Sequence, residues 1–292
     1  MKAFKDHSPI VTAVYYLSAI SLLMLFPHPV FLLLAFSGAF LYSFFEERRP
    51  SPLLHLGFLF LFLLLTAVNP IFSHNGRTVL FVINDAPITL EAILFGAVSG
   101  GCLVSSLYLF RSFTVIMTRD KLLYVFGALS PKLALVLSMG LRYVPLFRER
   151  ARRITDSQRA LGLYKEDNIL DKAKGDLRVF SILVTWALEN GVTTADSMAA
   201  RGYGGRRRSH YSPFRFRRGD AFLLLLILAF TALCAVGGAM GALSTVFYPT
   251  FSVAAPTPLG IGAYAAYGLL SLTPVILEAK ERVKWRCLRS RI

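Results

Sequence analysis

The sequence has few of the residues from which catalytic and metal sites are built. Its 292 residues include three cysteines and five histidines, and none of these form a CxxC motif or a close metal-binding pair. It has no GxxxxGKS/T phosphate loop, so the chain is not expected to bind ATP by itself. No carboxylate lies in the interior of a clear apolar stretch, which argues against a proton-coupled pump. These absences predict a protein that is not an enzyme and holds no cofactor.

Acidic residues are scarce beside basic and apolar ones. The chain has 17 Asp and Glu against 32 Lys and Arg, a net charge of +15, and 55% hydrophobic residues. A soluble protein of this length cannot bury so many apolar side chains, because its surface must be hydrated. The composition therefore indicates a membrane protein with its positive charge outside the apolar stretches. The arginines at 206–208, 215, 217 and 218 precede a span, so we expect them to contact lipid headgroups rather than nucleic acid.

Six apolar stretches are long enough, or nearly long enough, to cross a bilayer. They cover residues 10–26, 30–45, 53–68, 90–117, 221–240 and 259–277. The first two are short and joined by Pro27-His28-Pro29, so they could form a tilted hairpin instead of two full crossings. The first does not end in small residues suited to signal-peptide cleavage, so we expect it to be retained.

Two features between these stretches predict local structure. The third stretch is expected to stop at Asn69-Pro70, and residues 79–83 have the composition of one strand of a small hairpin. Gly96 and Gly100 stand four residues apart in the fourth stretch, a spacing that allows another helix to pack closely.

The charges orient the chain. Residues 148–218 hold 16 Lys and Arg against 8 Asp and Glu, and residues 278–292 hold six against two. The loop at 69–91 has one arginine against two carboxylates. The positive-inside rule places the two basic segments in the cytoplasm and that loop outside. With four spans before the first basic segment and two after it, both termini are expected to be cytoplasmic.

The basic middle segment predicts two helices. Ser130 and Pro131 form a typical helix start, a hydroxyl cap with proline at the first helical position. One kinked helix can run from there to a stop at Gly162. A second is expected from Asp176 to residues 200–202, with Asn190-Gly191 as the place where it could break. Its apolar first half is expected to pack under the membrane helices, with Trp186 in a core or interface. The chain then divides into residues 1–120, 121–218 and 219–292.

Residues 187–203 contain the most distinctive motif, Ala-Asp-Ser-Met-Ala-Ala-Arg-Gly-Tyr at its end. It resembles the signature of the transmembrane T component (EcfT/CbiQ-like) of energy-coupling-factor (ECF) importers, in which an AxxARGY-like motif ends a cytoplasmic coupling helix. The early proline turn, the stretch at 69–76, and residues 141–145 leading into 157–162 are also similar. The resemblance therefore covers nearly the whole chain.

This resemblance implies an all-α, polytopic helical membrane protein of about six spans, with a cytoplasmic domain of crossing coupling helices. It also implies a multi-pass place in a prokaryotic cell membrane. In that family each coupling helix docks on one of two ABC-type ATPases, which bind the ATP. A separate membrane-embedded S component binds the substrate, a vitamin or a metal ion. The chain is thus expected to couple ATP hydrolysis to uptake.

The resemblance also marks the residues expected to dock the ATPases. The second motif contributes Ala200, Arg201 and Gly202, and the first contributes Ala160, Leu161 and Gly162. Small residues let a backbone enter a narrow groove, and a guanidinium offers five donors to carboxylates and carbonyls on its floor. Leu161 stands where arginine is usual in the family, and Arg159 is the candidate to replace that charge.

Two other classes remain as alternatives. A conventional ABC importer permease would form its own substrate path, but its Glu-Ala-Ala docking pattern has no good match here. A non-transport membrane scaffold, or a membrane enzyme, would need neither the two motifs nor their place between spans.

Overall fold

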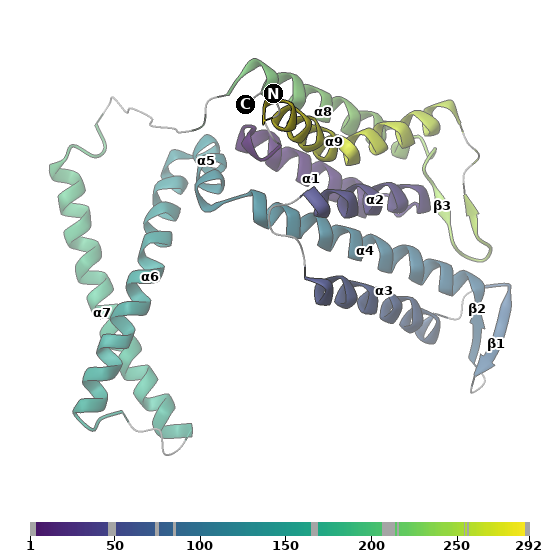
Figure 1. Cartoon of the computed structure of the whole chain (residues 1–292). Coiled ribbons are helices and arrows are strands. Elements are labelled where there is room, and N and C mark those ends of the chain that lie inside the picture. Colours follow the sequence, from purple (N-terminus) through teal and green to yellow (C-terminus); the bar gives the residue numbers. More distant parts are fainter. Residues whose placement is uncertain are drawn as a thin grey trace. The chain divides into compact units, whose positions relative to one another are not determined.

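The computed structural model describes most of the chain and divides it into two compact units. One unit comprises Met1–Leu122 with Phe214–Ile292, and the other comprises Leu123–Pro213. Each is considered by itself below (Figure 1). The described residues are 4–45, 51–73, 76–83, 86–164, 169–205, 214, 216–253, 255 and 257–289.

The first unit is almost entirely helical. A 3-10 turn at Phe4–Asp6 precedes its first helix. Its helices are α1 (Pro9–Leu25), α2 (Pro29–Phe45), α3 (Pro52–Phe72), α4 (Leu90–Ile116), α8 (Arg218–Ala239) and α9 (Pro258–Arg289). Two short antiparallel hairpins pair β1 (Val79–Ile83) with β2 (Ala86–Thr89) and β3 (Thr245–Val246) with β4 (Ser252–Val253).

These helices confirm an all-α membrane protein. All six apolar stretches are helical, and α3, α4, α8 and α9 are long and apolar enough to span a bilayer. The shorter helices α1 and α2 have 17 residues each, the lower limit for a span. The arginines at 206–208 and 215, expected to contact lipid headgroups, lie outside the described residues. Arg217 is the N-cap of α8 and Arg218 its first residue, and both are exposed.

Two helices extend beyond the predicted apolar stretches. Helix α3 continues through Asn69-Pro70 to Phe72, and the Asn69 side chain donates a 2.6 Å hydrogen bond to the Ala92 carbonyl of α4. This contact holds the last turn in place despite the proline. Helix α9 continues past residue 277 to Arg289, because its lysines, arginines and glutamates are good helix formers. Hydropathy therefore located the spans but not the ends of these helices.

The spacing of Gly96 and Gly100 has the predicted consequence. A Cβ atom on Gly96 would lie 3.1 Å from the Thr66 carbonyl oxygen of α3, and one on Gly100 would lie 3.1 Å from the Leu65 Cβ. The absence of side chains thus lets α3 and α4 approach closely. The predicted strand at residues 79–83 is also confirmed as β1. The second hairpin was not foreseen, and its Pro249 carbonyl accepts a hydrogen bond from the Arg77 amide near the first hairpin.

A histidine–aspartate contact joins the two sequence halves of this unit. His7 Nδ1 lies 2.6 Å from Asp220 Oδ1, and the Asp220 side chain is 2% exposed. The same carboxylate accepts hydrogen bonds from the backbone amides of Ser8 and Arg217. The N-terminal turn is thereby tied to the first turn of α8, although 213 residues separate the two side chains.

His28, in the proline turn between α1 and α2, is a buried structural histidine. Its Nδ1 accepts a 3.1 Å hydrogen bond from the Val30 amide, and its Nε2 lies 2.9 Å from the Tyr264 hydroxyl of α9. Because Nδ1 accepts, the ring is neutral with its proton on Nε2. Burial lowers the pKa of His28 below its ordinary value of 6.5.

This arrangement predicts a loss of stability in acid. Below about pH 6.5 the unfolded chain takes up a proton that the folded His28 resists, so the free energy of unfolding falls as the pH drops toward the lowered folded pKa. Thermal unfolding in detergent at pH 7.5 and 5.5 measures the effect. His28→Asn keeps an acceptor for the Val30 amide but does not titrate, so it should show a smaller acid shift. An equal shift in both proteins would contradict the assignment.

The second unit contains the end of α5 (Arg119–Leu129) and two long helices, α6 (Pro131–Ala160) and α7 (Ile169–Ala200). The predicted start of α6 is confirmed, with Ser130 as its N-cap, although the Ser130 hydroxyl makes no cap hydrogen bond. Two expectations for α7 were wrong. It begins at Ile169 instead of Asp176, and it runs unbroken through Asn190-Gly191. A single glycine costs a helix only about 1 kcal/mol, which this 32-residue helix tolerates.

Candidate functional site

Helices α6 and α7 cross as an antiparallel pair (Figure 1). The Tyr143 hydroxyl lies 3.2 Å from Thr194 Oγ1. Further along, the Phe147 ring meets Trp186 edge-on at 5.9 Å, and the Arg150 guanidinium lies 5.3 Å from the Trp186 ring centre. Trp186 is therefore an interface residue, as expected. Because residues later in α6 meet residues earlier in α7, the C-terminal ends of the two helices lie on opposite sides of the crossing.

The first tip, at the end of α6, has a Schellman cap. The Gly162 amide donates to the Arg159 carbonyl at 2.9 Å, and the Leu163 amide donates to the Gln158 carbonyl at 3.0 Å. Gly162 has φ +70°, the left-handed conformation that glycine adopts without steric penalty. Leu161 is the C-cap residue and its side chain is 68% exposed.

The second tip, at the end of α7, repeats this cap. The Gly202 amide donates to the Ala199 carbonyl at 2.9 Å, and the Tyr203 amide donates to the Met198 carbonyl at 3.0 Å. Gly202 has φ +77°. The same pattern of capping hydrogen bonds thus recurs 40 residues later in the sequence. Arg201 at the second tip corresponds to Leu161 at the first. Arg201 is exposed, as are its neighbours Ala200 and Gly202.

Arg159 does not occupy the place of Arg201. The shared hydrogen-bond pattern aligns it with Ala199, two positions before the C-cap. Its guanidinium lies 5.3 Å from the centre of the Tyr164 ring, and the Tyr164 hydroxyl donates to Asp176 of α7. A further bond joins Arg178 to the Leu163 carbonyl. The first tip is therefore braced against the start of α7.

The alignment of the tips also reveals similarity that the sequence reading missed. Asp156-Ser157 and Asp196-Ser197 stand at matching places, and each serine hydroxyl donates to the carbonyl four residues earlier. Comparing the chain with itself at an offset of 40 residues would have found the shared pattern Asp-Ser-x-x-Ala-x-Gly. The two helix ends thus share the same sequence pattern and the same capping structure.

The two helices have little core of their own. Large apolar side chains on both are exposed, among them Leu133, Val136, Ile169, Leu177 and Phe180. Apolar surface of this extent marks contact with lipid or another protein. The expectation that the first half of α7 packs under the membrane helices stays a prediction. Among the described residues, no group of His, Cys, Asp and Glu could hold a metal ion.

The fold and these tips define a class, a polytopic helical membrane protein carrying a crossed pair of long, glycine-capped helices. Residues 3–211 match the profile of the CbiQ family, described as cobalt transport protein. The chain belongs to this family. The match includes α1 to α7 and both tips.

Curated relatives are consistent with this assignment. The energy-coupling factor transporter transmembrane protein EcfT of Listeria innocua is 25% identical over 222 residues, or 72% of this chain and 80% of that protein. The EcfT protein of Lactococcus lactis is 24% identical over 193 residues, covering 59% of this chain and 69% of that protein. That of Streptococcus thermophilus is 30% identical over 111 residues, covering 37% and 42%.

Proposed function

We propose that this chain is the energy-coupling transmembrane subunit of an ECF-type ABC importer. One observation carries the proposal: a member of this family has two equivalent, exposed tips on opposite sides of a helix crossing. At 1.5 Å per residue, each tip lies roughly 20 Å from the contact between Phe147 and Trp186. Two separated and similar tips suit two similar partners, such as a pair of ATPase subunits.

The chemistry of the tips suits entry into a groove on each ATPase. Gly162 and Gly202 have open space around them, with no atom within 4 Å of an added Cβ. A partner can therefore approach the backbone closely at both tips. Arg201 adds a charged fork with five N–H donors, whereas Leu161 offers only apolar surface. The two contacts therefore differ in strength, and Arg201 is the stronger anchor.

The exposed apolar sides of α6 and α7 suit a different partner. A membrane-embedded S component that binds a vitamin or a metal ion would cover apolar surface of this kind. Movement of the tips with their ATPases would then change the crossing of the helices and shift the S component. The basic composition of residues 148–218 supports a cytoplasmic place for this unit, with both termini on the same side of the prokaryotic cell membrane.

Co-purification and transport test this function together. The tagged chain, purified in mild detergent, should retain two ABC-type ATPases and a small membrane protein. Reconstituted uptake should require ATP and persist when an ionophore removes ion gradients. Uptake that continues without ATP but stops with the ionophore would show a secondary carrier instead.

Variants of Leu161 test the weaker tip. Leu161→Ala removes apolar contact and should weaken ATPase retention by about 1–3 kcal/mol, as for a buried aliphatic side chain. Leu161→Arg should be tolerated if the partner groove keeps an acidic or carbonyl-rich floor. The measurement is ATPase bound per tagged chain. Retention that is unchanged in Leu161→Ala would mean that the first tip makes no such contact.

A further inference from the structure

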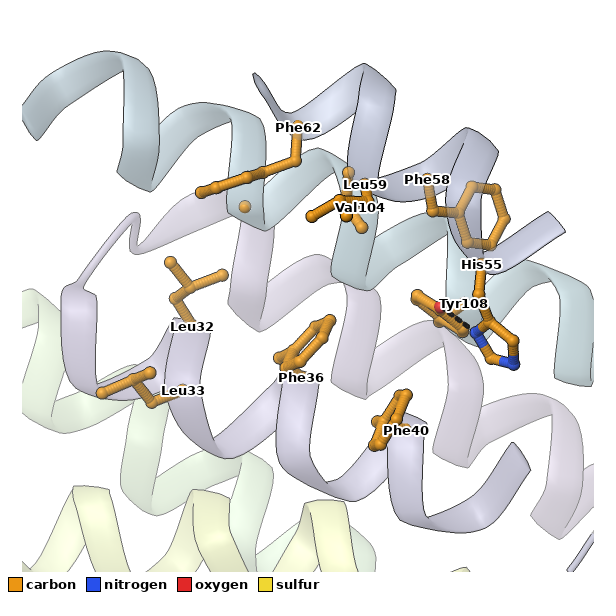
Figure 2. A pocket seen from close by; sticks show the side chains of 11 residues that line it. Leu32, Leu33, Phe36, Phe40, His55, Phe58, Leu59, Phe62, Val104 and Tyr108 are labelled. Carbon is orange, nitrogen blue, oxygen red and sulfur yellow. Dashed lines mark hydrogen bonds between the residues drawn. The ribbon is translucent and has the colours of Figure 1, made fainter. Parts of the chain in front are cut away.

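A lateral groove lies within the first unit (the membrane unit), among helices other than α6 and α7. It has a volume of about 390 Å³ and lies between α2 and α3, with α4 as its floor. Its lining is almost wholly apolar and comes from all three helices, with Leu33 and Phe36 on α2, Leu59 and Phe62 on α3, and Val104 on α4. Figure 2 shows these side chains turned toward a common space.

The packing of the three helices explains why this space exists. Helix α3 packs closely against α4 and α4 against α2, whereas the backbones of α2 and α3 stay apart. At Gly101 an added Cβ would lie 2.8 Å from a Leu32 methyl group, so the floor is closed where α2 meets α4. Leu33 and Leu59 remain 67% and 53% exposed on the two sides. The groove therefore opens sideways between α2 and α3.

One end of the groove is polar. His55 Nδ1 lies 2.6 Å from the Tyr108 hydroxyl, and Figure 2 shows this pair at the end opposite Leu33 and Phe62. The Phe40 ring lies 5.8 Å from His55, and the Phe58 ring lies 4.6 Å from Tyr108. Arg111 follows Tyr108 by three residues on the same side of α4. The groove thus has an apolar body and a hydrogen-bonding end, with a cationic residue about one turn further along α4.

We propose that this groove binds one acyl chain of an anionic phospholipid, with the phosphate at the His55–Tyr108 end. Helices α3 and α4 are long and apolar enough to span a bilayer, so hydrocarbon faces the opening. A void of this size falls within the range of small-ligand sites, and apolar walls give water no hydrogen-bond partners. A partner α-helix is about 10 Å across and would need a wider groove than this one.

The charges at the polar end favour a phosphate. When His55 Nδ1 accepts from the Tyr108 hydroxyl, Nε2 carries a proton that it can donate to a phosphate oxygen. The Arg111 guanidinium adds a cation on the same side, and hydrogen bonds to charged groups are the stronger ones. The bound acyl chain would fill the space between α2 and α3. It would hold α3 in place from the side that α4 does not cover. The inference rests on the membrane location of the chain and not on its coupling role.

A tryptophan reporter tests the site in the full chain. The two native tryptophans, Trp186 and Trp285, are first replaced by phenylalanine. Phe62→Trp then places a reporter in the groove, and Leu64→Trp places one on the opposite side of α3. In vesicles of brominated phosphatidylglycerol both reporters should be quenched. After transfer to detergent without brominated lipid, only Phe62→Trp should stay quenched, because the groove retains its lipid.

Two further comparisons make the test specific. Val104→Phe fills the floor of the groove and should abolish the retained quenching, whereas Leu103→Phe, on the neighbouring outward position, should not. His55→Phe keeps the aromatic packing but removes the polar contact to the phosphate, so retention of phosphatidylglycerol should weaken about tenfold. If the fluorescence of both reporters recovers equally in detergent, the proposal is overturned. If the Phe62→Trp reporter is protected from quenching only when an S component is bound, the groove binds a protein partner and not a lipid.

Discussion

Arg201→Glu is expected to abolish retention of the ATPase at the second tip while membrane insertion stays normal. The substitution replaces five N–H donors by a carboxylate at an exposed C-cap position, next to a glycine that lets the partner approach the backbone. Losing one side of a desolvated charge contact costs about 2–5 kcal/mol, which corresponds to a weakening of about thirtyfold to above a thousandfold. ATPase bound per tagged chain measures the loss directly.

Arg152→Glu is the matched control for this variant. It makes the same charge change on an exposed position of α6, nine residues before Leu161 and therefore about 13 Å from the first tip. Its ATPase retention should stay near that of the wild type. Arg201→Glu and Arg152→Glu with the same retention would show that net charge, not the tip, governs association.

Asp220→Ala is expected to destabilise the membrane unit more than a substitution elsewhere on α8. The change leaves the His7 ring and the Ser8 and Arg217 amides without their carboxylate. Leaving a buried donor without its partner costs about 1–3 kcal/mol, and this change affects three donors. Thermal unfolding in detergent should show a clear fall in the melting midpoint, while insertion into the membrane persists.

His7→Ala provides the comparison within the same cluster. Asp220 then keeps its bonds to two backbone amides, so the loss should be smaller, about 1–3 kcal/mol. A lower melting midpoint for Asp220→Ala than for His7→Ala would support the role of the carboxylate in holding the N-terminal turn to α8. The reverse ranking would mean that the carboxylate does not hold the N-terminal turn to α8.

Sequence alone located the spans because an apolar run of membrane length is a strong local signal. It also identified the helix start at Ser130-Pro131, the strand β1 and the close approach at Gly96 and Gly100, each of which depends on a few neighbouring residues. The His7–Asp220 pair could not be predicted, because the two residues lie 213 positions apart in the sequence. The groove beside α3 depends on which helices do not touch, and a single sequence does not record that.

For the tips, sequence predicted both helix ends at small residues followed by glycine. The two left-handed glycines and the repeated capping bonds agree with that reading of the local structure. The sequence did not show that Arg159 aligns with Ala199, because that correspondence comes from matching hydrogen bonds. It also could not place the tips on opposite sides of a crossing, which depends on contacts between residues such as Phe147 and Trp186.

Cross-linking at the two tips tests the central claim most directly. Leu163 and Tyr203 follow the two glycines at equivalent positions, and each is about half exposed, so a photoreactive phenylalanine analogue at either one should leave the caps intact. The account predicts that each tip cross-links to an ATPase subunit and that a chain with both groups captures two ATPase copies. An intact, active complex in which neither tip cross-links to an ATPase, or in which both reach the same copy, would contradict it.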